Sequence, residues 1–313
     1  MTLNCSKELG GYPGLELGEC AFNIKSSSIS LNTARNSLRY VIRAYNIKEI
    51  FVPYYTCPVV WQAIKKENCK INFYHVNKDF LPREEFTEDA FVLYTNYFGI
   101  CAKNVKLLAK KYRNLIIDNA QAFYMPKYGI ASFNSIRKFF GVPDGSLLYC
   151  DKKLEDEFET DISYPRFTHL LKRLDIDASS GYQDFCKDEE LLNNEPVKYM
   201  SNLTYKIFNQ IDTQRAKAIR LENFRILHES LKNSNELKFE LDTDDVPMAY
   251  PYLVEENGLK QKLISKKIYC ATYWNPLPDE YTEGYFQKYL VPLPLDQRYC
   301  ANDMHRVLEV VYE

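Results

Sequence analysis

The sequence predicts an α/β protein with a mostly parallel central sheet and a small α+β lobe toward its C-terminal end. Between residues 32 and 150, helical patterns alternate with short apolar strands, which is typical of a parallel sheet. A long amphipathic helix or helix pair is then expected over 203–231. The chain of 313 residues, 46% of them hydrophobic, is long enough for one large domain and a smaller lobe.

The remaining elements follow from local patterns. Apolar residues at helical spacing predict helices over 38–45, 58–66, 105–112, 259–266 and 301–311. Short apolar runs predict strands over 50–52, 71–76, 90–94, 115–118 and 145–149, and in the lobe over 248–254 and 268–272. The stretch 151–200 is polar and irregular, and we interpret it as a connecting excursion. Residues 1–200 are therefore expected to form the large domain, and 201–313 the long helix and the lobe.

Composition argues against several classes of partner and site. The net charge of −2 arises from 40 basic and 42 acidic residues without long runs of one sign, so no nucleic-acid partner is expected. The nine cysteines contain no C-x-x-C pair, which favours free thiols in a reducing cytosol over disulfides or a metal site. No apolar run is long enough for a signal peptide or a membrane span, so a cytoplasmic protein without membrane attachment is expected.

The segment 115–150 carries the most informative chemistry. A buried strand ends at Asp118, Lys138 follows 20 residues later, and Gly145 begins a turn into another strand. In open α/β sheets, ligands bind at the carboxyl ends of strands, which is where Asp118 is expected to lie. Pyridoxal 5'-phosphate (PLP) requires these two groups, because a lysine bonds to its aldehyde and a carboxylate keeps its pyridine nitrogen protonated.

This segment resembles the DegT/DnrJ/EryC1/StrS sugar aminotransferases. Residues 118–122 read D-N-A-Q-A, similar to the family's D-A-A-Q-A run, and Lys138 stands six residues before Asp144-Gly145, as the family lysine precedes its Glu-Gly. The resemblance implies the three-layer PLP-dependent transferase fold, which is aspartate aminotransferase-like. It also implies that Asp118 binds the pyridine nitrogen, that Gln121 bonds the ring hydroxyl side, and that Lys138 holds the cofactor and shuttles the proton.

Shorter motifs extend the resemblance over residues 32–311. Thr33-Ala34 resembles the family's phosphate-binding turn at a helix start, where free backbone amides favour an anion. Residues 52–56, V-P-Y-Y-T, resemble the V-P-x-x-T turn beside the cofactor ring. Residues 96–99, N-Y-F-G, and 293–295, L-P-L, resemble the H-L-Y-G turn and the closing L-P-x-H segment. The shared order of these motifs supports the resemblance more than any one of them.

Three positions depart from the family pattern. Cys57 stands where an aromatic ring usually stacks on the pyridine, so Tyr55 is a candidate substitute. Phe133 stands at the phosphate-binding serine, so Ser132 or Ser135 is expected to replace it. Residues 197–201, V-K-Y-M-S, lack the asparagine of the family's G-x-N-Y-R segment, which reaches the phosphate from the partner subunit. The expected cofactor-binding residues are Lys138, Asp118, Gln121, Thr33, Ala34, Tyr55, Cys57, Ser132 and Ser135.

Each chemical interpretation has a plainer alternative. Lys138 beside Arg137 could be a solvated basic pair, Asp118 could cap a helix, and Thr33 could be an ordinary N-cap. Taken together, the motifs predict a PLP-dependent aminotransferase with Lys138 and Asp118 as catalytic residues.

The resemblance also indicates the partners of such an enzyme. The expected substrates are a keto-sugar, nucleotide-linked, and an amino-acid donor such as glutamate, and the resemblance implies a homodimer. A PLP enzyme of other chemistry, such as a dehydratase, and a non-catalytic binding or regulatory descendant are the alternatives. The departures at Cys57, Phe133 and Val197 keep the second alternative open.

Overall fold

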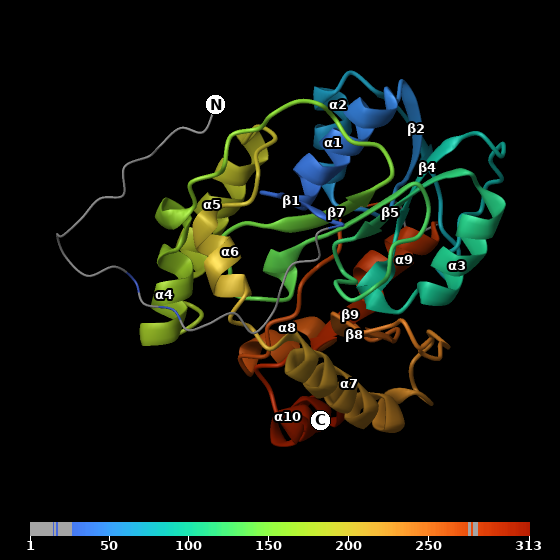
Figure 1. Ribbon diagram of the computed structural model, residues 1–313. Helices are drawn as coiled ribbons and strands as arrows, with labels where there is room; N and C mark the ends of the chain where they lie inside the picture. Colours follow the sequence, from blue (N-terminus) through green and yellow to red (C-terminus); the bar gives the residue numbers. More distant parts are fainter. Residues whose placement is uncertain (1–14, 16, 18–26, 275–276, 278–280) are drawn as a thin grey trace.

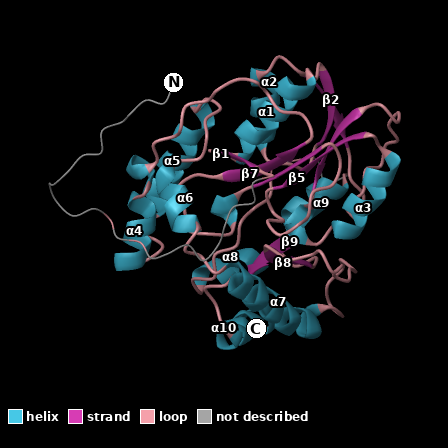
Figure 2. Cartoon of the chain, in the orientation of Figure 1, coloured by secondary structure: helices cyan, strands magenta, loops and turns pink. Residues whose placement is uncertain are grey.

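The computed structural model describes residues 15, 17, 27–274, 277 and 281–313. Its centre is a seven-stranded sheet in the order β1-β7-β6-β5-β4-β2-β3 (Figures 1 and 2). The strands are β1 (Ile29–Leu31), β2 (Glu49–Pro53), β3 (Lys70–Tyr74), β4 (Phe91–Thr95), β5 (Asn114–Asn119), β6 (Ala131–Asn134) and β7 (Ser146–Cys150). Only β7 runs antiparallel to its neighbours, so the predicted mostly parallel sheet is confirmed.

Helices cover both faces of this sheet, which makes the domain three-layered. The α1 (Ala34–Tyr45) and α2 (Pro58–Lys66) helices pack on one face, where Ile116 of β5 joins their apolar residues. The α3 helix (Ala102–Lys111) and Phe286 of α9 (Thr282–Tyr289) pack on the other, against Leu115 and Ile117. Because strand residues point alternately to the two faces and both are covered, β5 is apolar on both faces over residues 115–117. This buried strand carries Asp118 toward its end.

The C-terminal lobe is a separate small α+β unit (Figure 1). Strands β8 (Ala249–Leu253) and β9 (Leu290–Pro294) pair antiparallel, and α7 (Thr213–Leu231), α8 (Leu259–Ser265) and α10 (Ala301–Tyr312) share their hydrophobic core. The strand expected over 268–272 is wrong. Ile268 and Cys270 are buried and Tyr269 is exposed, so the segment has the alternation of a strand. It packs through side chains without pairing, because the partner of β8 is β9.

The excursion expected over 151–200 contains two helices that the sequence analysis did not place. These are α4 (Thr168–Asp175) and α5 (Tyr182–Asn194), which lie beside α6 (Asn202–Phe208) in Figure 1. Phe208 of α6 packs with Phe140 of the large domain. The boundary at residue 200 stays a prediction, but this contact ties α6 to the large domain.

A tight turn before β7 fixes the start of α6. Gly145 has φ +115, and a Cβ atom there would lie 3.0 Å from Met200 Sδ, so glycine is required. Asp144 is fully buried and accepts hydrogen bonds from the backbone N and the hydroxyl of Ser201, both at 2.8 Å, and from the Thr204 hydroxyl. Asp144 therefore holds the first turn of α6.

We expect Asp144→Ala to lower the free energy of unfolding by about 3 kcal/mol, because it removes a charged acceptor and leaves buried donors unpaired. Urea denaturation measures the change. The control is Asp212→Ala, which removes the exposed N-cap carboxylate of α7 and should cost about 1 kcal/mol. Equal losses in the two variants would contradict the role of Asp144.

Candidate functional site

A cavity of about 300 Å³ opens where the carboxyl ends of the parallel strands meet the first turn of α1. It brings together residues that lie up to 156 positions apart, from Thr33 to Glu189. Its lining residues are Thr33, Ala34, Arg35, Leu38, Cys57, Val59, Val60, Asp118, Ala120, Phe133, Ser135, Arg137, Lys138, Phe185 and Glu189. Six of the nine expected cofactor-binding residues are among them: Thr33, Ala34, Cys57, Asp118, Ser135 and Lys138.

Asp118 is a buried carboxylate with one oxygen left for a ligand. Its side chain lies in the penultimate position of β5, and the residue is 6% exposed. Oδ1 accepts a hydrogen bond from Ala120 N at 2.8 Å, and Oδ2 has no hydrogen-bond partner among the described residues. Burial raises the pKa of Asp118 above its ordinary value, although the charge of Lys138 and the Ala120 amide oppose the rise. A cationic N–H donor in the cavity would therefore stabilise the ionised carboxylate.

Lys138 carries an amine that no described residue engages. It ends the short 3-10 helix Ile136–Lys138 between β6 and β7, and its side chain is exposed. No ion pair or hydrogen bond to Nζ occurs among the residues that the structure describes. The side chain also borders two further cavities, of about 360 and 300 Å³. Lys138 thus stands where three cavities meet, and it is accessible from more than one side.

The plainer alternative, a solvated Arg137–Lys138 pair, holds for the exposed Lys138 but not for Arg137. The side chain of Arg137 is 13% exposed, lines the cavity and pairs with Glu189. The two basic residues therefore have different surroundings, and only the lysine is without an anionic partner within the described ranges.

The first turn of α1 presents free backbone amides to the cavity. Thr33 is the N-cap, and its Oγ1 accepts from Asn36 N at 3.2 Å, so the ordinary capping role is confirmed. The Ala34 and Arg35 amides precede the first intrahelical hydrogen bond and have no partner among the described residues. Thr33 and Ala34 both line the cavity, so capping and anion binding are compatible here.

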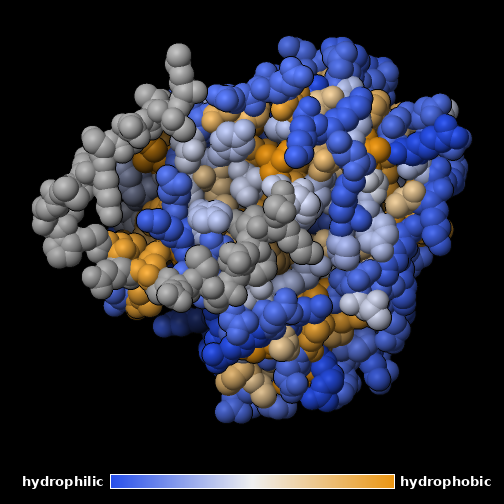
Figure 3. All heavy atoms as spheres, in the orientation of Figure 1, coloured by the Kyte–Doolittle hydropathy of each residue, from blue (hydrophilic) through white to orange (hydrophobic). Residues whose placement is uncertain are grey.

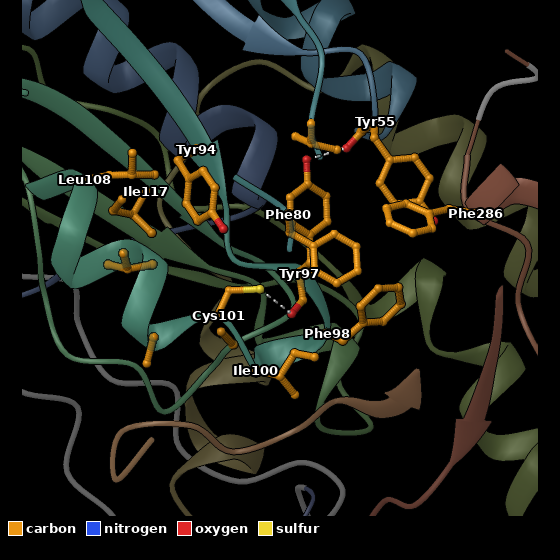
Figure 4. Packing of buried hydrophobic residues seen from close by; sticks show 14 of the residues in the cluster. Tyr55, Phe80, Tyr94, Tyr97, Phe98, Ile100, Cys101, Leu108, Ile117 and Phe286 are labelled. Atoms are coloured by element: carbon orange, nitrogen blue, oxygen red, sulfur yellow. Dashed lines mark hydrogen bonds between the residues drawn. The ribbon is translucent and has the colours of Figure 1, made fainter. Parts of the chain in front are cut away.

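Tyr55 lies outside the cavity lining. Its ring belongs to an aromatic cluster on the α3 face of the sheet that includes Tyr97 (Figure 4). The rings of Tyr55 and Tyr97 stack with centroids 5.6 Å apart, and Tyr55 is edge-on to Trp274. Burial raises the pKa of its phenol, whose oxygen has no hydrogen-bond partner. The aromatic side chains that do border the cavity are Phe133 and Phe185.

Ser132 and Gln121 do not line the cavity either. Ser132 precedes Phe133 in β6, and since adjacent strand residues point to opposite faces, only Phe133 faces the cavity side. Gln121 is buried, with Oε1 accepting from Phe98 N at 2.7 Å, and its Nε2 has no hydrogen-bond partner. Of the two candidate serines, the structure therefore favours Ser135.

Residues 197–201 are tied to the edge of the sheet. Met200 N donates to Ser30 O, and Asn32 N donates to Lys198 O, both at 3.0 Å. None of these five residues lines the cavity of the same chain. Their contribution to a partner subunit remains a prediction.

Sequence reasoning missed four polar or aromatic lining residues: Arg35, Arg137, Phe185 and Glu189. Arg35 directly follows Thr33-Ala34, and Arg137 directly precedes Lys138, so their adjacency to the motifs was an available signal. Phe185 and Glu189 belong to α5, which packs over the cavity only through tertiary structure.

Two further observations concern the described residues as a whole. The cysteines that the structure describes are all free thiols: Cys57, Cys69, Cys101, Cys150, Cys186, Cys270 and Cys300. None of the helices in the described ranges is both long and apolar enough to span a bilayer.

Solved structures resemble this fold closely enough to identify it. A DegT/DnrJ/EryC1/StrS aminotransferase from Brucella abortus is 15% identical, with a TM-score of 0.60 over 91% of this chain and 85% of that chain. The Streptococcus pneumoniae protein Spr1654 in its PLP form is 14% identical, with a TM-score of 0.63 over 91% and 86%. The GDP-4-keto-6-deoxymannose-3-dehydratase ColD with bound GDP-perosamine is 12% identical, with a TM-score of 0.61 over 91% and 88%.

Sequence comparison adds nothing to this, since no family model and no curated protein matches the chain. At identities of 12 to 15%, the structural likeness establishes the architecture. The chain has the fold of the DegT/DnrJ/EryC1/StrS aminotransferases.

Proposed function

We propose that this protein is a PLP-dependent aminotransferase that acts on a keto-sugar, nucleotide-linked, and takes its amino group from an amino acid such as glutamate. One observation carries the proposal. A single cavity joins a buried carboxylate, an unengaged lysine and the free amides of a helix start, namely Asp118, Lys138 and the first turn of α1. The fold likeness supports it, because one similar structure is a PLP form and another holds a GDP-sugar.

The residues present fit PLP. Asp118 Oδ2 is an unused hydrogen-bond acceptor, and burial raises the pKa of this carboxyl group. A pyridinium N–H beside it would stabilise the ionised carboxylate. The α1 amides and the Ser135 hydroxyl are donors for a phosphate, and Cys57 and Phe133 provide apolar walls for a ring. Gln121 Nε2 is a buried donor without a partner among the described residues, but Gln121 lies outside the cavity lining, so we propose no contact between it and the ring.

The chain's own residues would then divide the chemistry. When bound, PLP supplies an aldehyde that bonds to amines and a ring that accepts electrons. Asp118 would keep the ring nitrogen protonated. Lys138 would hold the cofactor until the substrate amine displaces it, and its free Nζ would then take a proton from the α carbon of the amino donor and return it to the carbon that had been the cofactor aldehyde. The exposed position of Lys138 leaves it room for both tasks.

The cavity of about 360 Å³ on the far side of Lys138 is our proposed substrate entrance. It lies between α4 and the C-terminal lobe, and its lining includes Arg173, Lys267 and Arg306. Arg173 forms no ion pair with any described residue, so its guanidinium is available to an anionic group. A nucleotide-linked sugar, which carries phosphates, suits this lining better than a neutral sugar.

The alternatives make different predictions for the purified protein with PLP. An aminotransferase should show a visible absorption band that disappears when glutamate or another donor is added and returns when a keto-sugar nucleotide is supplied. A dehydratase should convert its sugar without consuming an amino donor stoichiometrically. A binding protein should show no donor-dependent spectral change. If no amino acid in a panel of donors makes the band disappear, the aminotransferase proposal is contradicted.

We also propose that the protein is a cytoplasmic homodimer. Most of its exposed large hydrophobic residues gather between residues 162 and 205, and Figure 3 shows hydrophobic atoms at the surface in the region of α4. Leu174 and Ile176 are 82% and 67% exposed. Exposed apolar residues concentrated in one part of the chain are typical of a protein–protein contact, and twofold dimers are the commonest soluble homo-oligomers.

Leu174→Glu is expected to shift the protein from dimer to monomer, because it places a charge within the apolar contact. Sedimentation velocity at micromolar concentration measures the change. Leu107→Glu is the matched control: Leu107 is 54% exposed on α3, outside this surface, and should leave the dimer intact. A wild-type monomer, or an intact dimer in the Leu174→Glu variant, would contradict this placement of the interface.

A further inference from the structure

The carboxylate of Glu189 lies at the end of the cavity nearest the start of α1, between two arginines. Arg137 Nη2 donates to Glu189 Oε1, and Arg35 Nη2 lies 3.5 Å from Glu189 Oε2. The arginine side chains are only 11% and 13% exposed, and all three residues line the cavity. An anion is therefore already held where the α1 amides are free.

The charges at this position are not balanced by Glu189 alone. Two guanidinium groups face one carboxylate, and Lys138 adds a further positive charge nearby. Although desolvation opposes ionisation, the charges of Arg137, Arg35 and Lys138 hold the pKa of Glu189 below its ordinary value. Burial lowers the pKa of Arg35, so one carboxylate does not fully compensate it. Nε of Arg137 is also buried without a hydrogen-bond partner.

A phosphate dianion would match this arrangement better than Glu189 does. It carries the second negative charge, and its oxygens accept hydrogen bonds from arginine forks more fully than one carboxylate can. Phe133 provides no donor at this end of the cavity, and Ser135 provides a single hydroxyl. The positive charges of Arg35 and Arg137 are thus the main groups that can bind an anion at this end of the cavity.

Glu189 can leave this position at little cost to packing. It belongs to α5, whose only buried residues are Asp188 and Leu192. Its side chain is 35% exposed, so rotation would return its carboxylate to water. The arginines, in contrast, are held by α1 and by the segment that precedes Lys138.

We infer that Arg35 and Arg137 form an anion subsite in which Glu189 is the resident counter-ion, and that the phosphate of PLP binds by displacing the Glu189 carboxylate. This inference rests on the proposed function for the identity of the ligand. Glu189 then competes with the cofactor, because its carboxylate and the cofactor phosphate bind the same two arginines. The affinity for PLP then depends on how much more strongly the two arginines bind the phosphate than the Glu189 carboxylate.

The test compares PLP with pyridoxal, which lacks the phosphate, by equilibrium titration followed by absorbance and calorimetry. Arg35→Gln and Arg137→Gln should each weaken PLP binding about 10-fold or more and leave pyridoxal binding within about twofold, because a hydrogen bond to a charged group is lost. Arg137→Lys keeps the charge but not the planar fork, and should bind PLP more tightly than Arg137→Gln and more weakly than the wild type. Glu189→Gln should tighten PLP binding about 10-fold, because the competing anion is gone.

Matched controls lie on the same helices. Arg43→Gln changes an α1 arginine that pairs with Glu67 outside the cavity, and Glu190→Gln changes the exposed neighbour of Glu189. Both should bind PLP as the wild type does. Unchanged PLP affinity in both arginine variants, or an equal loss for pyridoxal, would overturn the inference. Weaker PLP binding in Glu189→Gln would overturn the displacement.

Inorganic phosphate separates this inference from the proposed function. Phosphate should raise the melting temperature of the wild type, raise it further in Glu189→Gln, and have no effect in Arg137→Gln. If the wild type shows no visible band with PLP, the proposed function fails, and the phosphate series alone then decides whether the subsite exists. A phosphate effect that is the same in all variants would refute the subsite.

Discussion

Lys138→Ala is expected to abolish both the visible absorption band with PLP and all measurable transamination, a loss of more than about 10³-fold in turnover. The reason is that its amine supplies the covalent bond to the cofactor and the proton transfer, and no second lysine of the described ranges lines the same cavity. Absorbance spectra and a coupled assay of glutamate consumption measure the two losses. The fold should remain intact, because Lys138 is exposed and makes no hydrogen bond with the described residues.

The control for this variant is Lys110→Ala, which removes an exposed lysine on α3 and should change neither the spectrum nor the activity. A Lys138→Ala protein that keeps its band and its turnover would exclude Lys138 as the cofactor-binding residue. A variant that loses its thermal transition would instead point to a structural role, and circular dichroism separates the two cases.

Asp118→Asn is expected to retain PLP and to lose about 10²- to 10⁴-fold in turnover. An amide cannot hold the pyridine nitrogen protonated, so the ring no longer accepts electrons as readily. The backbone position should persist, because the Asn side-chain oxygen can still accept from Ala120 N. Single-turnover kinetics with glutamate isolates the chemical step from cofactor binding.

The control is Asp89→Asn, which changes an exposed carboxylate in the segment between β3 and β4. It should leave the rate unchanged. If Asp118→Asn transaminates at the wild-type rate, Asp118 acts only as a structural acceptor for the turn after β5. If it loses PLP altogether, the carboxylate contributes mainly to affinity.

Some parts of the site could be predicted because they depend on local sequence. The run 115–118 is apolar up to a single carboxylate, so a buried strand that delivers Asp118 to the sheet edge follows from its pattern. Thr33 before an amphipathic helix likewise specifies an N-cap. These two elements and Lys138 were sufficient to place the cavity.

Other parts depend on tertiary packing that no local pattern encodes. Strand β6 has four residues, two of them polar, so the sequence pattern did not predict it. Without this strand, the orientation of Ser132 away from the cavity could not be predicted either. Tyr55 was expected beside the cofactor, but the aromatic residues of distant segments hold it in a core cluster. Helix α5 buries few residues, so its weak pattern could not indicate that it brings Glu189 to the arginines.

The most direct test of the proposed function is borohydride reduction of the purified protein with PLP, followed by peptide mapping by mass spectrometry. We expect one stable cofactor adduct, on the peptide that contains Lys138, and no adduct when the protein is reduced without added PLP. Absence of an adduct, or an adduct on a lysine outside the cavity, would contradict the assignment of Lys138 and the proposed chemistry with it.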